Sequence, residues 1–410
     1  MRRRTAAGLS LRGKWVGCGD DNSAMTSAQD TTTVTTAPAA ALEGAAALPH
    51  LGVIQAQGEE AANFLHNQLT NDVLLLPVGQ SRLAAFCSAK GRMQASFVVV
   101  KTAPDTVLLV LPQDLLPQTL KRLSMFVLRA KVKLSDASGQ WLLRGLMGET
   151  ARATLGDAAP WQAVAWAGGH AVALYPAMAG VACHTRAFWI GALDQPAPEA
   201  PALTAEQWAW GSVLSGVPFV TQPVFEAFVP QMLNYESVGG VNFKKGCYPG
   251  QEVVARSQFR GTLKRRATLA HAEAPLQAGQ EVFHSGDPSQ PSGVVAQAAP
   301  APGGGFDAIV SLQVSAMEGG AHVVMEAICS GVPVLASRVA GNIGMLGDNY
   351  DGFFKVGDAH ELAKLLIRLR EDHLFSTQLA MQCAERAYLF EPARERCGLI
   401  TIVQNLTLKE

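Results

Sequence analysis

Residues 244–256 read Lys-Lys-Gly-Cys-Tyr-Pro-Gly-Gln-Glu-Val-Val-Ala-Arg, and this stretch decides how the fold is interpreted. A single thiol, Cys247, lies among glycines that permit a tight backbone turn, and Pro249-Gly250 suits the centre of a type II turn. Basic side chains close in the sequence favour the thiolate form, namely Lys244, Lys245 and Arg256. The stretch predicts a redox-active or nucleophilic cysteine, or else a small buried apolar cysteine in a structural turn.

Three further segments extend this pattern along the chain. They read Gln-Leu-Thr-Asn-Asp-Val at 68–73, Phe-Cys-Ser-Ala-Lys-Gly-Arg-Met at 86–93 and Pro-Gln-Met-Leu-Asn at 230–234. Together with Lys-Gly-Cys-Tyr-Pro-Gly-Gln-Glu at 245–252, they resemble the YgfZ type of folate-binding relatives of the glycine-cleavage T-protein. The resemblance covers roughly residues 48–316.

The resemblance implies an α+β fold, a three-domain aminomethyltransferase-like cloverleaf around a central folate cavity, with a C-terminal β-barrel. It implies tetrahydrofolate or a derivative as the cofactor. It also implies a folate-binding accessory role in support of iron–sulfur enzymes, including the methylthiolation of tRNA. The expected partners are therefore folate and iron–sulfur enzymes or cluster-assembly proteins. One cysteine cannot by itself hold a cluster, so that connection would run through a partner or a second copy.

The site residues follow from the same resemblance, position by position. Cys247 is the functional, candidate catalytic cysteine, and Trp208 matches an aromatic position that lines the folate site. A second aromatic folate position falls at Leu51, which weakens the expected affinity for a pterin. The remaining candidate cofactor-binding residues are Lys245, Tyr248, Gln251, Glu252 and Arg256, and no metal site is expected. Trp208 could equally be a core residue of an amphipathic helix.

An enzymatic role depends on a carboxylate that this sequence lacks at the expected place. Related aminomethyltransferases use an aspartate where this chain has Lys-Gly-Arg-Met-Gln-Ala at 90–95. A neutral Gln94 cannot act as a general base, so we expect no glycine-cleavage activity and no classical enzyme. Asp72 remains a nearby acid, and a role as a helix-end or turn residue is at least as strongly indicated for it. His66 is expected to be a surface helix residue and not a catalytic base. The alternative is a tetrahydrofolate-dependent aminomethyl or one-carbon transferase.

The C-terminal part carries a different pattern. Glu318-Gly319-Gly320 is followed by Glu326 and by Gly-Val-Pro-Val-Leu-Ala-Ser at 331–337, as in nucleotide sites where a helix N-terminus faces phosphate. This part is similar to retaining GT-B glycosyltransferases (family 4-like), in which Glu326 would bind the donor ribose and Glu318 would lie near the sugar. Most of such a fold is missing, so we expect a truncated, partial Rossmann-like segment without sugar-nucleotide transferase activity, with an exposed sheet edge.

Composition shifts divide the chain into six expected segments. Helices are expected near 58–69, 115–127 and from Thr204, and strands at 96–101, 106–111, 130–134, 141–147, 163–166 and 171–175. The segments are a disordered tail (1–46), a first folate-binding part (47–143), a second α+β domain (144–203), the return to the folate-binding domain (204–262), a small β-barrel (263–316) and the glycosyltransferase-like segment (317–410).

Charge and cysteine content bound the function classes. The net charge is −1, so we expect no strong direct binding to nucleic acid, and no apolar run is long enough to span a membrane. Seven scattered cysteines without a CxxC pair favour a reducing cytoplasm. The basic N-terminus resembles a transit peptide, but we favour a true start at Met25.

Overall fold

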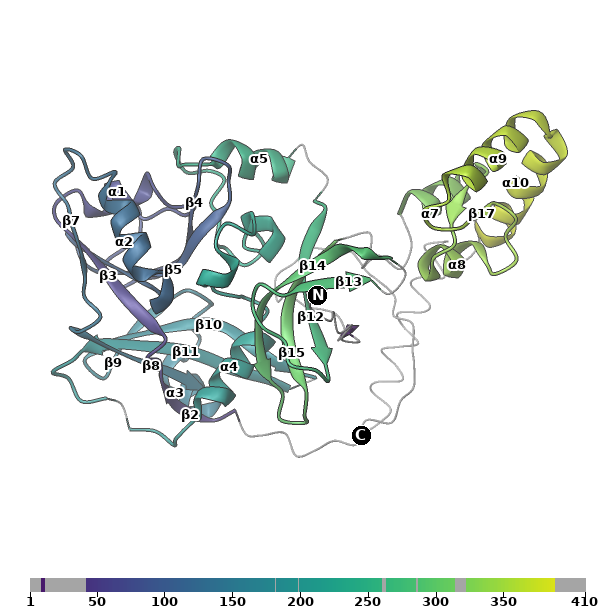
Figure 1. Ribbon diagram of the computed structural model, residues 1–410. Helices are drawn as coiled ribbons and strands as arrows, with labels where there is room; N and C mark the ends of the chain where they lie inside the picture. Colours follow the sequence, from purple (N-terminus) through teal and green to yellow (C-terminus); the bar gives the residue numbers. More distant parts are fainter. Residues whose placement is uncertain are drawn as a thin grey trace, which may run out of the picture. The chain divides into compact units, whose positions relative to one another are not determined.

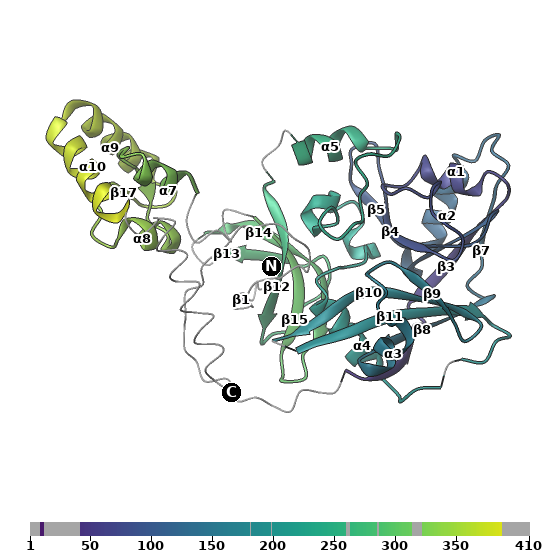
Figure 2. The ribbon, with the colours of Figure 1, turned by 180° about the vertical axis from the view of Figure 1, so that it is seen from behind.

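The computed structural model describes residues 9–11, 42–180, 182–197, 199–259, 263–284, 287–313 and 322–387. The chain divides into two compact units, Met1–Gln313 and Val314–Glu410, each described by itself below. Most of the regular structure is antiparallel sheet with helices on its faces, which is a mixed α/β architecture (Figures 1 and 2). Among the described residues, no helix is both long and apolar enough to cross a membrane.

The first sheet is built mainly from apolar strands that are buried over most of their length, whereas its edge strand, Lys133–Asp136, is polar and has no buried residue. Its strand order is β4-β5-β6-β3-β7, all antiparallel. The strands are β3 (Leu51–Gln57), β4 (Ser81–Cys87), β5 (Met93–Ala103), β6 (Thr106–Pro112) and β7 (Lys133–Asp136), accompanied by helices α1 (Ala61–His66), η1 (Gln113–Leu115) and α2 (Leu116–Ser124). Branched and aromatic side chains on β5 and β6 favour strand and fill this layer.

The second sheet has the order β2-β8-β11-β10-β9 and carries helix α3 against it. Its elements are β2 (Gly44–Ala47), β8 (Trp141–Met147), α3 (Glu149–Leu155), β9 (Ala163–Trp166), β10 (Gly169–Ala179) and β11 (Ala182–Ala192). Strand β11 runs antiparallel to both β10 and β8 through the middle of the sheet. Its inner residues are therefore buried on both sides, as Trp189 and Ile190 are.

The third sheet occupies the place of the expected small β-barrel but is not closed. Its order is β1-β12-β15-β14-β13, and within the described ranges β1 and β13 stand at opposite edges without pairing, so the sheet is open. The strands are β1 (Leu9–Leu11), β12 (Arg265–Ala272), β13 (Glu281–His284), β14 (Asp287–Pro300) and β15 (Phe306–Gln313). Register shifts interrupt the β13–β14 and β14–β15 pairs, which bends the sheet without closing it.

Helix α4 (Ala205–Leu214) links the second and third sheets by packing on β10, β14 and β15. Thr204 begins it with the expected cap, because its hydroxyl accepts from the Gln207 amide while the Gln207 side chain accepts from the Thr204 amide. The chain then passes through η2 (Gln222–Val224) and η3 (Pro230–Leu233) to helix α5 (Gln251–Phe259). The cysteine motif leads directly into α5.

The second unit has its own small core around Ile328, Tyr350, Phe375, Leu379 and Cys383. It alternates helix and strand, as expected, but its sheet is only the parallel pair β16–β17. Its elements are α7 (His322–Cys329), β16 (Ala336–Ser337), α8 (Ala340–Leu346), β17 (Phe353–Phe354), α9 (Ala359–Glu371) and α10 (His373–Ala387). A Rossmann-like arrangement remains a prediction.

The local expectations from sequence compare well with the elements. The predicted strands at 141–147 and 163–166 coincide with β8 and β9, and those at 96–101 and 106–111 fall inside β5 and β6. The helix predicted from Gly58 begins only at Ala61, so its acids precede the first turn. Glu60 instead accepts a hydrogen bond from the Lys131 amide at 2.6 Å, which ties the helix start to a distant loop.

Candidate functional site

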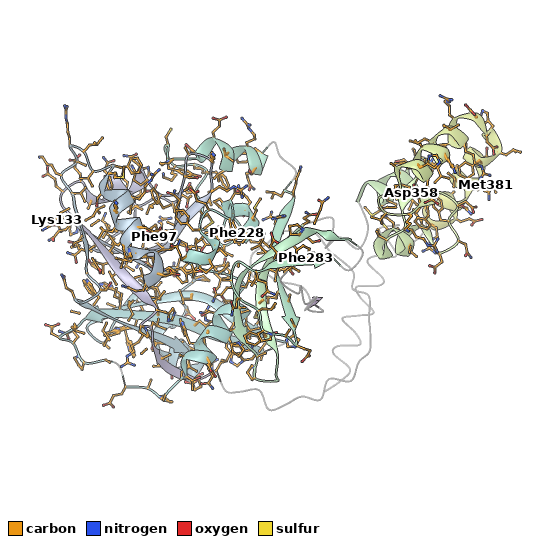
Figure 3. All side chains as sticks on the ribbon, in the orientation of Figure 1. Phe97, Lys133, Phe228, Phe283, Asp358 and Met381 are labelled. Atoms are coloured by element: carbon orange, nitrogen blue, oxygen red, sulfur yellow. The ribbon has the colours of Figure 1, made fainter. Side chains whose placement is uncertain are left out.

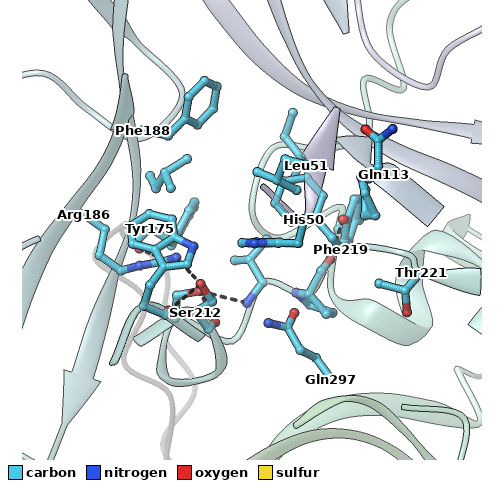
Figure 4. A pocket seen from close by; sticks show the side chains of 18 of the residues that line it. His50, Leu51, Gln113, Tyr175, Arg186, Phe188, Ser212, Phe219, Thr221 and Gln297 are labelled. Atoms are coloured by element: carbon cyan, nitrogen blue, oxygen red, sulfur yellow. Dashed lines mark hydrogen bonds between the residues drawn. The ribbon is translucent and has the colours of Figure 1, made fainter. Parts of the chain in front are cut away.

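A cavity of about 420 Å³ lies in the first unit, where the three sheets and helix α4 meet (Figure 4). Its walls are mostly apolar and aromatic, with a few polar groups among them. The lining comprises His50, Leu51, Leu83, Pro112, Gln113, Asp114, Trp161, Leu174, Tyr175, Arg186, Phe188, Trp208, Ser212, Ser215, Val217, Pro218, Phe219, Thr221, Tyr235 and Gln297. An apolar hollow with a few convergent polar groups is the usual form of a small-molecule site.

Polar groups differ between the two sides of this cavity. His50, Gln113 and Asp114 are exposed residues at the ends of strands β3 and β6, so they form its mouth. Arg186, from β11, is buried on the wall that also carries Tyr175 and faces Leu51 and Gln113 (Figure 4). The cavity therefore runs from a wet, polar mouth to a dry wall that holds a cation.

Trp208 and Leu51, two of the predicted cofactor-binding residues, both line this cavity. Trp208 lies on α4 with only 5% of its surface exposed, so it also belongs to the core, as the alternative interpretation had it. A Cβ built on Gly145 would lie 2.4 to 2.7 Å from three adjacent atoms of the Trp208 ring, so β8 covers one ring face. The Arg186 guanidinium lies over the ring, 4.8 Å from its centroid.

The cysteine motif forms a second site, distinct from the cavity lining. Cys247 is exposed, so the interpretation as a small buried apolar residue is wrong. Gly250 has a φ of +80°, as a type II turn requires, and a Cβ there would lie 2.3 Å from the carbonyl oxygen of Ser88. Gly91 is similarly close to Val253, because a Cβ added at Gly91 would lie 2.9 Å from the Cβ of Val253. The motif loop therefore rests on the loop at 88–91, which explains why both segments carry glycine.

Lys245 lies beneath the Cys247 loop with 8% of its surface exposed. Its ammonium donates to the backbone carbonyls of His66 at 2.5 Å and Leu69 at 3.0 Å, and it lies 4.7 Å from the centroid of the Tyr248 ring. Burial lowers the pKa of Lys245 from 10.5 to about 8, although the nearby negative charges of Asp72 and Cys247 act in the opposite direction. Burial likewise raises the pKa of Tyr248.

His66 and Asp72 also lie at the Cys247 loop. His66 Nδ1 is 3.2 Å from Asp72 Oδ1, and a Cβ on Gly246 would lie 3.6 Å from His66 Nε2. The side chain of His66 is only 12% exposed, so the expectation of a surface helix residue is wrong. Asp72 is a turn residue as predicted, because Oδ1 accepts from the Leu75 amide at 2.9 Å.

The other predicted cofactor-binding residues lie on the cysteine motif and not in the cavity lining. Tyr248 is buried beside Lys245, and Gln251 begins α5. Glu252 and Arg256 form an exposed i,i+4 ion pair at 2.7 Å on that helix. The structure thus brings Trp208 and Leu51 together in one place, and the other five with Cys247 in another. Their binding roles remain a prediction.

Comparison with known proteins identifies relatives for both units. Residues 39–180 match the family described as the GCVT N-terminal domain, and residues 306–390 match glycosyl transferases group 1. The tRNA-modifying protein YgfZ of Vibrio vulnificus strain CMCP6 is 29% identical over 227 residues, 53% of this chain and 67% of that protein. The protein of the same name from Shigella sonnei strain Ss046 is 29% identical over 224 residues, 53% and 68% of the two chains.

The chain is a YgfZ-like protein with a glycosyltransferase-like C-terminal segment. An uncharacterised protein of Haemophilus influenzae is also similar, with 26% identity over 235 residues, 56% of this chain and 75% of that one. The chain thus spans about two thirds to three quarters of these relatives' length. A solved aminomethyltransferase T of the Bartonella henselae glycine cleavage system overlays 67% of this chain and 79% of that one, with 17% identity and a TM-score of 0.45.

Two residues of the YgfZ-like unit escaped the sequence interpretation. Arg186 is a lone charge at the start of the apolar run Ala-Phe-Trp-Ile, and only its isolation could have drawn attention to it. Nothing in the sequence around Glu226 indicated a role for it. In the structure, its Oε1 accepts a hydrogen bond from Gln94 Nε2 at 2.7 Å. The Glu226 carboxylate therefore lies next to Gln94, the position at which related aminomethyltransferases are expected to carry an aspartate. Neither Glu226 nor Gln94 lines the cavity.

The predicted glycosyltransferase residues belong to the second unit. Glu318 lies outside the described residues, and Glu326 lies within α7. The family match begins at residue 306, inside β15, and that strand pairs with β12 and β14 of the first unit. The first residues of the family match therefore belong to the third sheet of the first unit and not to the second unit.

Proposed function

We propose that the chain binds a reduced folate in the cavity and acts as an accessory protein for iron–sulfur enzymes, including those that methylthiolate tRNA. The observation that carries this proposal is the aromatic cavity of about 420 Å³ with a buried arginine, in a chain similar to YgfZ proteins. A cavity of this size lies in the usual range for small-molecule sites.

The residues of the cavity fit a folate. The dry wall offers Phe188 and Tyr175 to a flat ring, and Arg186 supplies a charged donor whose Nε has no partner among the described residues. The exposed mouth can leave a charged glutamate tail in water. A reduced folate carries one-carbon units; the residues around it in this chain bind and orient it and exclude water.

Cys247 is proposed to act towards a partner and not towards the cavity ligand. Its thiol is exposed on a loop that glycines hold in a fixed turn, and Lys245 lies close enough to interact with its charge. An exposed, rigidly presented thiol suits contact with a macromolecular partner such as an iron–sulfur enzyme.

Titration with 5-formyltetrahydrofolate tests the folate part. Trp208 and Trp161 both line the cavity, so occupancy should change tryptophan fluorescence, and calorimetry should give the same dissociation constant. Replacing Trp208 by Phe should reduce the fluorescence change. A flat response in both measurements from folded protein would refute folate binding.

Genetic rescue tests the role of Cys247. In a bacterial strain that lacks its own YgfZ, the wild-type chain should restore methylthiolated tRNA, and Cys247→Ser should not. Cys183→Ser is the matched control, because Cys183 is also an exposed thiol but lies on β11, away from the motif. Full rescue by Cys247→Ser would exclude the proposed role.

The second unit is proposed to be catalytically silent. Its described residues contain a two-stranded sheet, and the family match covers only residues 306–390. A sugar-nucleotide site needs a wider sheet with a crevice at its carboxyl edge. Calorimetry with UDP should give no heat of binding, and measurable binding would contradict this part of the proposal.

A further inference from the structure

Arg186 is a buried cation without an acidic partner. It is 5% exposed, and its hydrogen bonds go to neutral acceptors, from Nη2 to Ser212 Oγ at 2.7 Å and from Nη1 to the Tyr175 carbonyl at 3.3 Å. Nε is buried and has no partner among the described residues. No carboxylate in the described part of the chain lies within ion-pair distance of it.

A buried guanidinium in this position is unfavourable while one of its N–H donors has no hydrogen-bond acceptor. Burial lowers the pKa of Arg186 to about 9, so the side chain is still charged at neutral pH. Hydrogen bonds to neutral groups and one aromatic face compensate only part of the lost hydration. Arg186 lines the cavity, so a bound ligand can supply the missing acceptor, and perturbed groups of this kind cluster at functional sites.

Trp208 fixes the direction of the guanidinium. One face of its ring packs on the backbone of Gly145, and Arg186 lies over the ring at 4.8 Å. Both parts of this stack are buried, so the guanidinium cannot swing to the mouth without losing it. Trp208 is thus a positioning residue for Arg186, while part of its ring still lines the cavity.

The arrangement also indicates which part of a ligand meets Arg186. A carboxylate tail keeps its hydration best at the mouth, beside the exposed His50 and Gln113. A flat ring buries its faces best among the aromatic residues of the dry wall, such as Phe188. We propose that Arg186 donates to the lactam oxygen of a pterin-type ring bound in this cavity, and so selects a 4-oxo ring over a 4-amino ring.

This inference rests on the proposed folate function, and a matched pair of ligands separates the two. Folic acid and aminopterin differ at ring position 4, which carries an oxo group in the first and an amino group in the second. An amino group presents N–H donors to a cation that needs an acceptor. The wild-type full chain should bind folic acid at least about tenfold more tightly than aminopterin by calorimetry, as expected for a charged hydrogen bond.

Variants of Arg186 then test the residue itself. Arg186→Met should weaken folic acid binding about tenfold or more, and the ratio between the two ligands should fall towards one. Arg152→Met is the control, because Arg152 is an exposed arginine on α3 paired with Glu149, and it should keep the wild-type ratio. Arg186→Lys retains a cation and should keep part of the preference for folic acid.

The unfolding temperature of the ligand-free protein distinguishes a role of Arg186 in binding from a role in stability alone. Without ligand, Arg186→Met should unfold at a temperature equal to or above that of the wild type, because it removes an uncompensated buried charge. Equal affinity of the wild type for both ligands, or unchanged affinity of Arg186→Met, would overturn the inference while leaving folate binding intact. Absence of binding by folic acid and by 5-formyltetrahydrofolate would instead refute the proposed function.

Discussion

At the scale of single residues, burial separates side chains that are adjacent in sequence. Lys244 is exposed and Lys245 is buried, although the sequence offers them as an equal pair. The same holds for cysteines, because Cys247 is exposed whereas Cys87 is buried, and burial raises the pKa of the Cys87 thiol to about 12. Position in the fold therefore decides which charges and thiols are chemically available.

The stability of the first unit should depend on pH through Lys245. Burial lowers the pKa of this ammonium to about 8 from 10.5, so between these values the unfolded chain binds more protons than the folded chain. The free energy of unfolding should therefore rise with pH across this window, and the full penalty of the buried charge is present below pH 8.

Urea unfolding of wild type and Lys245→Met at a series of pH values, with a thiol reductant, measures this effect. The rise should be lost in Lys245→Met and retained in Lys244→Met, which removes the exposed neighbour. Parallel pH profiles for wild type and Lys245→Met would show that the lysine is not the group responsible.

A substitution at Leu51 should raise the affinity for 5-formyltetrahydrofolate. It lines the cavity at a position where the resemblance places an aromatic residue, and it faces the wall that carries Tyr175 (Figure 4). Leu51→Phe should strengthen 5-formyltetrahydrofolate binding about fivefold, because an aromatic contact contributes about 1 kcal/mol beyond its buried area. Calorimetry checks this, and Leu51→Ala should weaken binding. Weaker binding by a folded Leu51→Phe variant would mean that the cavity has no space for the ring.

At the scale of elements, the four sequence motifs support one another. Thr70 donates to the Gly240 carbonyl and accepts from the Ala85 amide, so the 68–73 segment joins β4 to the loop before the cysteine motif. Gln231 Nε2 donates to the Val254 carbonyl at 2.7 Å, which ties the 230–234 segment to α5. These contacts make the motifs a scaffold for the loop that presents Cys247, and Thr70 and Gln231 have structural roles in it.

Gly250 should be the most sensitive position in this scaffold. Gly250→Ala introduces a left-handed alanine and a Cβ at 2.3 Å from the Ser88 carbonyl, so it should destabilise the first unit by more than about 2 kcal/mol. Gly79→Ala is a matched control with the same φ of +80° and open space around the new Cβ, and should lose only about 1 kcal/mol.

Urea unfolding gives both values. Equal losses would mean that the left-handed backbone alone, and not the contact between the two loops, makes glycine necessary at position 250.

At the scale of the whole molecule, the two compact units share no apolar core among the described residues. The large core of the first unit includes Phe97 and Phe228, and the second unit, with Asp358 and Met381 labelled in Figure 3, has its own core around Phe375. Helix α9 has no buried residue, and Leu366 and Ile367 are about half exposed. The second unit is therefore small and weakly packed for a domain.

Removal of the second unit should leave the first intact. A chain that ends at Gln313 retains all five strands of the third sheet, because β15 ends there. Its thermal midpoint and its affinity for 5-formyltetrahydrofolate should equal those of the full chain. A chain that ends at Phe306 loses β15 and should fail to fold. Loss of folding on truncation at Gln313 would show that the units depend on each other.

The sequence by itself determined the local features that depend on neighbouring residues. Periodicity and caps predicted β8, β9 and the start of α4 at Thr204, and the glycine motif predicted a turn at Pro249-Gly250. Only the tertiary structure decided that Arg186 is a cation without an acid, that the partly buried His66 lies beside Asp72, and that the third sheet stays open. Burial and sheet closure depend on residues that are distant in the chain, and no local pattern contains that information.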